Sequence, residues 1–187
     1  MNIERLHVRD AALMRAMTHP ARIAIIDHLQ LGEPATATEL ARIAGLSPSA
    51  TSYHLRALAK TGLIEDAPSR GDGRERVWRS AVRGLDIEPG QDSSMGDWTA
   101  AGELAALYLD RDDARARAWF DRAREESPEW YDVTILASNK VKVTPDELRA
   151  LNAQILALIE PYTAMVRTDA PPEARHVHLI YRAIPAS

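Results

Sequence analysis

The chain has 187 residues, of which 45% are hydrophobic and 27% are charged, as in an ordinary soluble globular protein. No run of eighteen apolar residues is present and the charged N-terminus lacks the apolar core of a signal peptide, so we expect a cytoplasmic protein without membrane contact. The absence of cysteine excludes disulfides, thiolate metal sites and thiol nucleophiles.

The net charge of −4 is unevenly distributed along the chain. Residues 1–85 hold 12 Lys+Arg and 9 Asp+Glu, a balance of +3, whereas residues 86–187 hold 11 and 18, a balance of −7. A mildly basic half joined to an acidic half favours a nucleic-acid-binding module that carries a second domain. Chance drift in composition is the alternative interpretation.

Three short helices are predicted in the first 45 residues. Asp10 can cap the segment AALMRAM, and Thr18 can cap a second helix with Pro20 in its first turn. The third helix lies in TATELARIAGLS. It starts from Thr36 or Thr38, buries Leu40, Ile43 and Ala44, and ends at Gly45, which favours a left-handed C-cap.

A fourth helix and a hairpin follow. Ser47-Pro48 supplies an N-cap and a first-turn proline, and the helix runs to about Thr61, before Gly62. The segments LIEDAP, SRGDG and RERVWR predict a strand, a turn and a second strand. This order is typical of a winged helix-turn-helix domain over residues 10–83. Residues 84–96, rich in glycine and poor in apolar residues, are predicted to be a linker.

The second half predicts a domain over residues 97–187. A long helix over 97–126, closed by Pro128, is a candidate dimer element. VTILASNKVKV and RHVHLIYRAI read as strands on either side of a helix that Thr144 and Glu147 start with a capping box. The expected fold class is therefore α+β and mainly α, with a winged helix-turn-helix domain and a C-terminal helical domain that contains a small two-stranded antiparallel sheet.

The fourth helix has two distinct sides. At 3.6 residues per turn, Thr51, Leu55 and Leu58 share a buried side. The opposite side, without any acidic residue, collects Ser49, Tyr53, Arg56 and Lys60, while Ser52 and His54 lie on the flanks. Hydroxyl groups at a helix start and cations further along suit phosphates and base edges. The alternative is that these are ordinary capping residues of a helix pair that binds no nucleic acid.

A resemblance to a known family rests on three motifs: His19-Pro20-Ala21-Arg22, Ser52-Tyr53-His54-Leu55 and Thr61-Gly62-Leu63-Ile64. Residues 10–83 resemble the ArsR-like winged-helix transcriptional regulators. The resemblance implies a DNA-binding, usually dimeric repressor. It also implies that Ser49, Ser52, Tyr53, His54 and Arg56 face the major groove, and that arginines of the wing face phosphates.

The complete set of predicted DNA-contact residues therefore spans the recognition helix and the wing. They are Ser47, Ser49, Ser52, Tyr53, His54, Arg56 and Lys60 in the helix, and Arg70, Arg74, Arg76 and Arg79 in the wing. Salt bridges within a solvated strand are the alternative role for the wing arginines.

The sequence gives little support for a metal site or for an enzyme active site. Metal-sensing members of the family often carry cysteines where Thr36 and Thr38 stand here, and threonine hydroxyls do not replace thiolates for soft metals. His176 and His178 have a metal-like spacing, but packed or solvated histidines explain so short a motif better. No catalytic motif is present, and no cofactor is expected.

The sequence thus predicts a sequence-specific DNA-binding transcriptional regulator, a dimeric repressor whose partner is double-stranded DNA. Residues 97–187 would dimerise or sense a small-molecule effector. The alternative function is a winged-helix protein–protein interaction module without DNA-binding activity.

Overall fold

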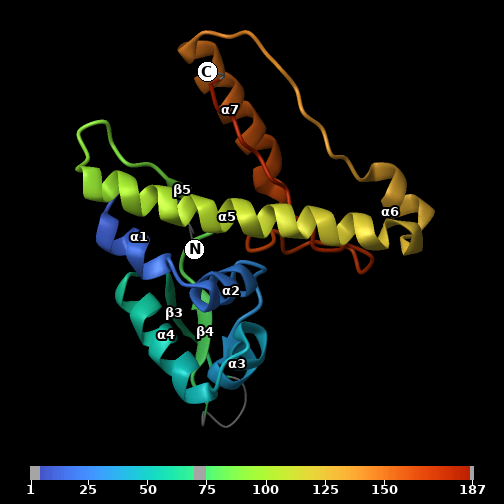
Figure 1. Cartoon of the computed structure of the whole chain (residues 1–187). Coiled ribbons are helices and arrows are strands. Elements are labelled where there is room, and N and C mark those ends of the chain that lie inside the picture. The colour runs from blue at the N-terminus through green and yellow to red at the C-terminus, as the bar shows by residue number, and fades with distance from the viewer. Residues whose placement is uncertain (1–4, 70–74, 186–187) are drawn as a thin grey trace. The chain divides into compact units, whose positions relative to one another are not determined.

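The computed structural model describes residues 5–69 and 75–185 of the chain (Figure 1). The chain divides into two compact units, residues 1–107 with 162–176 and residues 108–161 with 177–187. The division falls inside a long helix, further along the chain than the linker that we expected. Within the described ranges, no helix is both long and apolar enough to cross a membrane.

The first unit contains four short helices that the sequence predicts. Asp10 caps the first, and Thr36 and Glu39 form a capping box at the third. The second begins one residue later than expected, because His19 and not Thr18 is its N-cap. The helices are α1 Ala11–Met17, α2 Pro20–Leu29, α3 Ala37–Ala44 and α4 Pro48–Lys60.

A three-stranded antiparallel sheet lies beside these helices (Figure 1) and has the order β2-β4-β3. Its strands are β2 Ala35–Thr36, β3 Ile64–Ala67 and β4 Val77–Ser80. The pairing of Ile64 with Ser80 and of Ala67 with Val77 confirms the predicted hairpin. The tip of the hairpin, which includes the predicted contact residues Arg70 and Arg74, lies outside the described residues.

A second small sheet corrects the prediction that residues 84–96 are only a linker. Strand β5 (Gly84–Ile87) pairs in parallel with β1 (Arg5–Val8). The Arg5 Nε donates to Asp86 Oδ2 over 2.8 Å, and this contact lowers the pKa of the Asp86 carboxyl. A parallel pair so far apart in sequence leaves no local signal, because neither strand turns directly into the other.

The core of the first unit is formed by apolar side chains of α1, α2, α3, α4 and the antiparallel sheet. Helix α5 (Met95–Arg122) adds Ala100, Ala101 and Leu104 to it. The Asp97 carboxylate accepts from the Ala11 backbone N–H over 3.2 Å and so ties the start of α5 to the start of α1. The largest fully buried side chains are Met14, Met17, Ile25, Ile26, Leu29, Leu40, Leu55, Leu58, Leu63, Ile64, Leu104 and Val8.

The second unit contains the rest of α5 and further helical segments. The predicted capping box of Thr144 and Glu147 is confirmed at the start of α7. Pro128 opens a helix instead of closing one, because Ser127 before it is an N-cap. The segments are η1 Ala123–Glu125, α6 Pro128–Val133 and α7 Pro145–Ile159, followed by η2 Glu160–Tyr162 at the junction with the first unit.

The predicted C-terminal sheet is wrong. Residues 134–143 and 176–185 form neither helix nor strand, and neither segment pairs with another strand in the described part of the chain. Valine and isoleucine made both segments resemble strands. Composition alone does not make a strand, since its backbone groups need a partner. Among the residues that the structure describes, the antiparallel sheet of this α+β fold therefore lies in the winged helix.

Candidate nucleic-acid interface

The turn between α3 and α4 is defined by three local features. Gly45 ends α3 in the left-handed region, with φ of 65°. The Ser47 hydroxyl then accepts from the Ala50 backbone N–H over 3.3 Å, and Pro48 occupies the first turn, where no N–H is needed. These features fix where α3 ends and where α4 begins, so the N-terminus of α4 lies directly after the turn.

The predicted two sides of α4 are confirmed. Thr51, Leu55 and Leu58 are each fully buried. The four residues expected on the opposite side are all exposed: Ser49, Tyr53, Arg56 and Lys60. Tyr53 is 61% exposed, so its ring and hydroxyl are accessible to a partner.

Two serine hydroxyl groups at the start of α4 already form hydrogen bonds with the backbone of the same helix. Ser52 is half-buried, and its Oγ donates to the Pro48 carbonyl over 2.8 Å. Ser47 is used as the N-cap. Both hydroxyl oxygens retain capacity for a further hydrogen bond, since a hydroxyl has one donor and two acceptor sites. Ser49 is exposed at the same end.

His54 lies elsewhere than expected. The sequence placed it on the flank of α4 as a groove contact, but only 8% of it is exposed. Its Nδ1 accepts from Arg22 Nε over 3.2 Å, and its ring lies 4.4 Å from the ring of His19. The contacts with Arg22 and His19 hold the imidazole against the start of α2 instead of in solvent.

The surroundings of His54 disfavour its charged form. Burial lowers the pKa of the imidazole, and the nearby His19 and Arg22 lower it further. Arg22 is fixed in turn, because its Nη1 donates to the Ala16 carbonyl over 2.6 Å. The cluster of His19, Arg22 and His54 therefore joins the end of α1, the start of α2 and the middle of α4.

The described arginines of the wing are engaged in ion pairs across the hairpin. Arg76 binds Asp66 with its Nη2 2.6 Å from Asp66 Oδ2, and its guanidinium lies 4.1 Å from the centre of the Trp78 ring. Arg79 Nε donates to Glu65 Oε1 over 2.9 Å. Hydrogen bonding to Arg76 lowers the pKa of Asp66. Both arginines thus carry their charge on the surface, but each already has a carboxylate partner.

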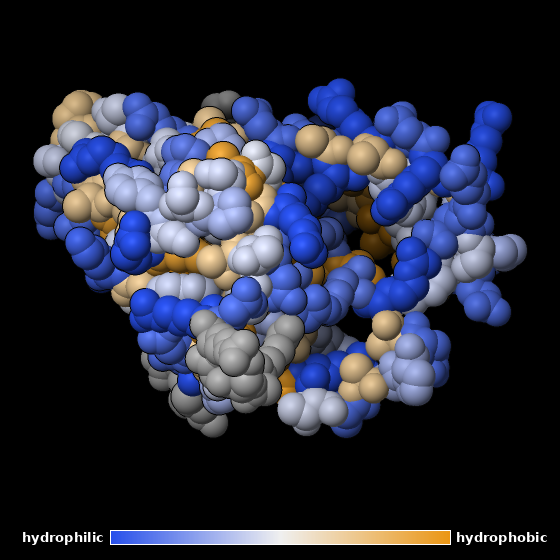
Figure 2. Space-filling model, turned by 90° about the horizontal axis from the view of Figure 1, so that it is seen from below, coloured by the Kyte–Doolittle hydropathy of each residue, from blue (hydrophilic) through white to orange (hydrophobic). Residues whose placement is uncertain are grey.

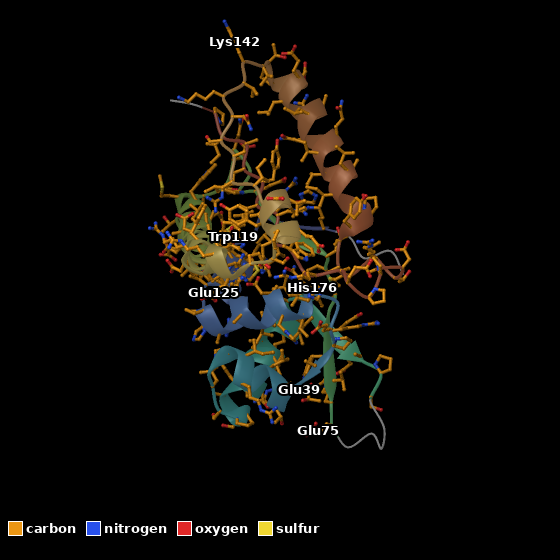
Figure 3. The ribbon with its side chains drawn as sticks, turned by 90° about the vertical axis from the view of Figure 1, so that its right-hand side faces the viewer. Glu39, Glu75, Trp119, Glu125, Lys142 and His176 are labelled. Atoms are coloured by element: carbon orange, nitrogen blue, oxygen red, sulfur yellow. The ribbon has the colours of Figure 1, made fainter. Side chains whose placement is uncertain are left out.

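Hydrophilic residues dominate the end of the first unit that carries α3 and α4. Figure 2 views this end from below, and blue covers most of it, with scattered apolar residues between. Ile43 of α3 is 42% exposed, although its helical spacing predicted a buried position. Figure 3 shows the acidic Glu75 at the far end of β4. The surface is therefore polar, with charges of both signs.

The described residues bring no group of three or more His, Asp or Glu side chains into positions that could hold a metal ion. We assign no role to His176 and His178.

Residues 17–67 match a family described as "Helix-turn-helix domain". Among curated proteins, the chain is similar to the HTH-type transcriptional regulator YgaV of Escherichia coli strain K12, with 54% identity over 56 residues. The aligned part is 29% of this chain, and the chain spans 56% of the length of that relative.

Two solved structures with likeness to the chain come from Sinorhizobium fredii and Mycobacterium bovis. NolR from Sinorhizobium fredii is 30% identical, with 52% of this chain and 82% of that chain covered and a TM-score of 0.34. The homodimeric winged helix-turn-helix domain of Mb0332 from Mycobacterium bovis, a possible ArsR-family transcriptional regulator, is 22% identical. That match covers 58% of this chain and 84% of that chain, with a TM-score of 0.35.

Proposed function

We propose that the protein is a sequence-specific DNA-binding transcriptional regulator that acts as a dimeric repressor. The match of residues 17–67 to a helix-turn-helix family and the similarity to a transcriptional regulator support this proposal. The observation that carries the proposal is the acid-free exposed side of α4. Ser49, Tyr53, Arg56 and Lys60 stand outward together, while the residues opposite them are buried.

The recognition helix would enter the major groove with this side forward. Arg56 suits the paired acceptors of a guanine, and Tyr53 and Ser49 suit base edges or phosphates. Ser47 and Ser52, at the positive end of the helix dipole, suit a phosphate, and Lys60 suits one further along. His54 acts behind this surface, through its contacts with α2, instead of in the groove.

The wing supplies contacts to phosphates in the same proposal. Arg76 and Arg79 would exchange their carboxylate partners for DNA, and Arg70 and Arg74 would extend the wing along the backbone. Such contacts bring affinity without sequence preference.

The roles of the two parts of the chain follow from the way in which a dimeric regulator binds two half-sites. Two half-sites about one helical turn apart require two recognition helices ~34 Å apart and therefore a dimer. We assign DNA binding to residues 10–83, and dimerisation or sensing of a small-molecule effector to residues 97–187. The protein would act beside DNA in the cytoplasm, without catalytic activity.

Selection of bound sequences from a random pool of double-stranded DNA tests the proposal. We expect a recovered operator with two related halves, bound at least 1,000-fold more tightly than unrelated DNA at the same salt concentration, on the order of ordinary specific regulators. Addition of metabolite extracts to the complex would then ask whether an effector releases the DNA. If no sequence is enriched and affinity at low salt is negligible, the domain is a protein-docking module and the proposal is wrong.

A further inference from the structure

One short turn of the chain after α7, residues 163–167, is packed against the rest of the first unit. Among residues 160–185, the half-buried residues are Thr163, Ala164, Met165 and Arg167, and all the others are exposed. The turn has a defined backbone, because the N–H groups of Val166 and Arg167 donate to the Thr163 carbonyl over 2.8 and 2.9 Å. We call these five residues the docking turn.

The docking turn lies against Gly32, in the loop between α2 and β2. Gly32 has a left-handed backbone, with φ of 82°. A methyl group added to Gly32 would lie 3.1 Å from the Ala164 carbonyl oxygen and 3.4 Å from the Met165 Cα. Both atoms belong to the backbone of the turn, so no side-chain rotation can move them aside. The lack of a side chain at Gly32 therefore permits the close approach of two backbones.

The loop that contains Gly32 leads directly into the helix-turn-helix. Ala35 is 2% exposed and pairs with Trp78 of the wing strand β4. Thr36 then caps α3, and α3 packs against the recognition helix α4. The docking turn thus contacts the segment that determines where α3 begins.

The other end of the docking turn is joined to α7. That helix ends at Ile159, and η2 Glu160–Tyr162 leads into Thr163. The residues of η2 are exposed, as are residues 168–185 on the other side of the turn. A contact between such exposed stretches opens locally, without unfolding of the core, and regulatory elements are drawn from contacts of this kind.

We propose that the docking turn is a regulatory contact: packed on Gly32, it holds the start of α3 in the DNA-binding arrangement, and its release lowers the affinity for DNA. The docked state is the binding state, because the outward side of α4 is exposed while the turn lies on Gly32. An effector bound by the second unit would act by drawing the turn away through α7. The inference deepens the proposed function and rests on it only for the effect on DNA.

Hydrogen exchange of the full chain tests the contact without DNA. Gly32→Ala places a methyl group against the docking turn, and we expect about 10-fold faster exchange at residues 163–167 and at residues 36–44. Gly62→Ala is the matched control, since Gly62 has a similar φ of 74° but no atom within 4 Å of the added methyl group. It introduces the same backbone strain and should leave the docking turn protected. Faster exchange in the docking turn alone would overturn the inference, because the turn would then not hold α3.

A second pair of variants changes the docking turn itself, in case Gly32→Ala fails to fold. Val166→Pro removes the N–H that donates to the Thr163 carbonyl. Val166→Ala keeps this N–H and alters only a side chain that is 41% exposed. We expect Val166→Pro to accelerate exchange at residues 36–44, as Gly32→Ala does, and Val166→Ala to leave it unchanged. Equal protection of residues 36–44 in the two Val166 variants would show that the inference is wrong.

Operator affinity measures the regulatory effect. Gly32→Ala and Val166→Pro should each weaken operator binding about 10-fold, within the ordinary range for coupled sites, while Val166→Ala binds as the wild type does. Operator DNA should in turn slow exchange at residues 163–167 of the wild type, since coupling between two sites is reciprocal.

The two proposals fail in different ways. Operator affinity that is unchanged in both Gly32→Ala and Val166→Pro contradicts this inference and leaves the proposed function standing. If no DNA sequence is selected but residues 36–44 lose protection together with the docking turn, the proposed function is wrong and the docking contact stands.

Discussion

Arg22 Nε donates a hydrogen bond to His54 Nδ1 over 3.2 Å and thereby links α2 to the middle of the recognition helix. The bond requires an unprotonated Nδ1, so His54 is held as the tautomer with its proton on Nε2. The bond between α2 and α4 therefore involves a residue that is buried beneath the exposed side of α4.

This bond predicts that mild acid weakens the domain. The pKa of His54 is lowered in the folded chain from its ordinary value of 6.5, so the unfolded chain takes up the proton first. The contribution of His54 to the free energy of unfolding is full above pH 6.5 and decreases as the pH falls below that value. This contribution is lost once the imidazole of the folded chain is protonated. We expect the free energy of unfolding and the operator affinity to fall together over this range.

Two variants of His54 separate charge from shape. His54→Asn keeps an acceptor near the Nδ1 position and cannot titrate, so it should bind DNA well and lose most of the pH dependence below 6.5. His54→Phe leaves Arg22 Nε without its acceptor and should lower the free energy of unfolding by about 1–3 kcal/mol. Chemical denaturation and DNA titrations from pH 5 to pH 8 measure both. Equal pH profiles in the wild type and His54→Asn would refute this role.

The exposed side of α4 predicts a loss of sequence discrimination. Arg56→Ala should weaken operator binding by about 1–3 kcal/mol while affinity for unrelated DNA changes much less. Arg149→Ala is the charge-matched control, because Arg149 is exposed at the start of α7 and pairs with Asp146 of the same helix. Competition titrations with operator and unrelated DNA give both numbers. Equal losses for the two variants would contradict base contact by Arg56.

The ion pairs of the wing predict that a carboxylate restrains DNA binding. Asp66→Asn removes the charge that Arg76 now binds and should raise DNA affinity of every sequence to a similar extent. Arg76→Ala should lower affinity and reduce the salt slope by about one unit. Salt titrations of binding compare the two variants with the wild type. An unchanged salt slope in Arg76→Ala would mean that Arg76 does not contact phosphates and serves only in the ion pair with Asp66.

Two glycines provide a matched test of the turn before α4. Gly45 has a left-handed backbone, so Gly45→Ala should cost about 1 kcal/mol of stability even though no atom lies within 4 Å of the added methyl group. Gly102 lies inside α5 with equally open surroundings, and Gly102→Ala should stabilise by roughly 0.5–1 kcal/mol. Urea unfolding measures both. If both substitutions changed the free energy of unfolding in the same direction, the free space around each glycine, and not its backbone conformation, would determine the effect.

Local chemistry explains what the sequence predicted correctly. The N-cap at Ser47, the capping box of Thr144 and Glu147 and the left-handed Gly45 each depend on residues within one helical turn. The sides of α4 followed from helical spacing alone. Such features are visible in sequence because the partners are close along the chain.

Long-range contacts explain what it missed. The parallel pairing of β1 with β5 joins segments about 80 residues apart, and no turn signal connects them. The inward position of His54 depends on α2, and the spacing within α4 leaves it at the edge between two sides. The two C-terminal segments have the composition of strands, but composition does not supply a pairing partner.

His19 is held by a contact of the same kind, since its Nδ1 accepts the backbone N–H of Ala21 and caps α2. Two imidazole nitrogens therefore act as acceptors on either side of Arg22, one at the N-cap of α2 and one in the middle of α4. The start of α2 and the middle of α4 are thus tied to one another through side chains that are 32 to 35 residues apart in sequence.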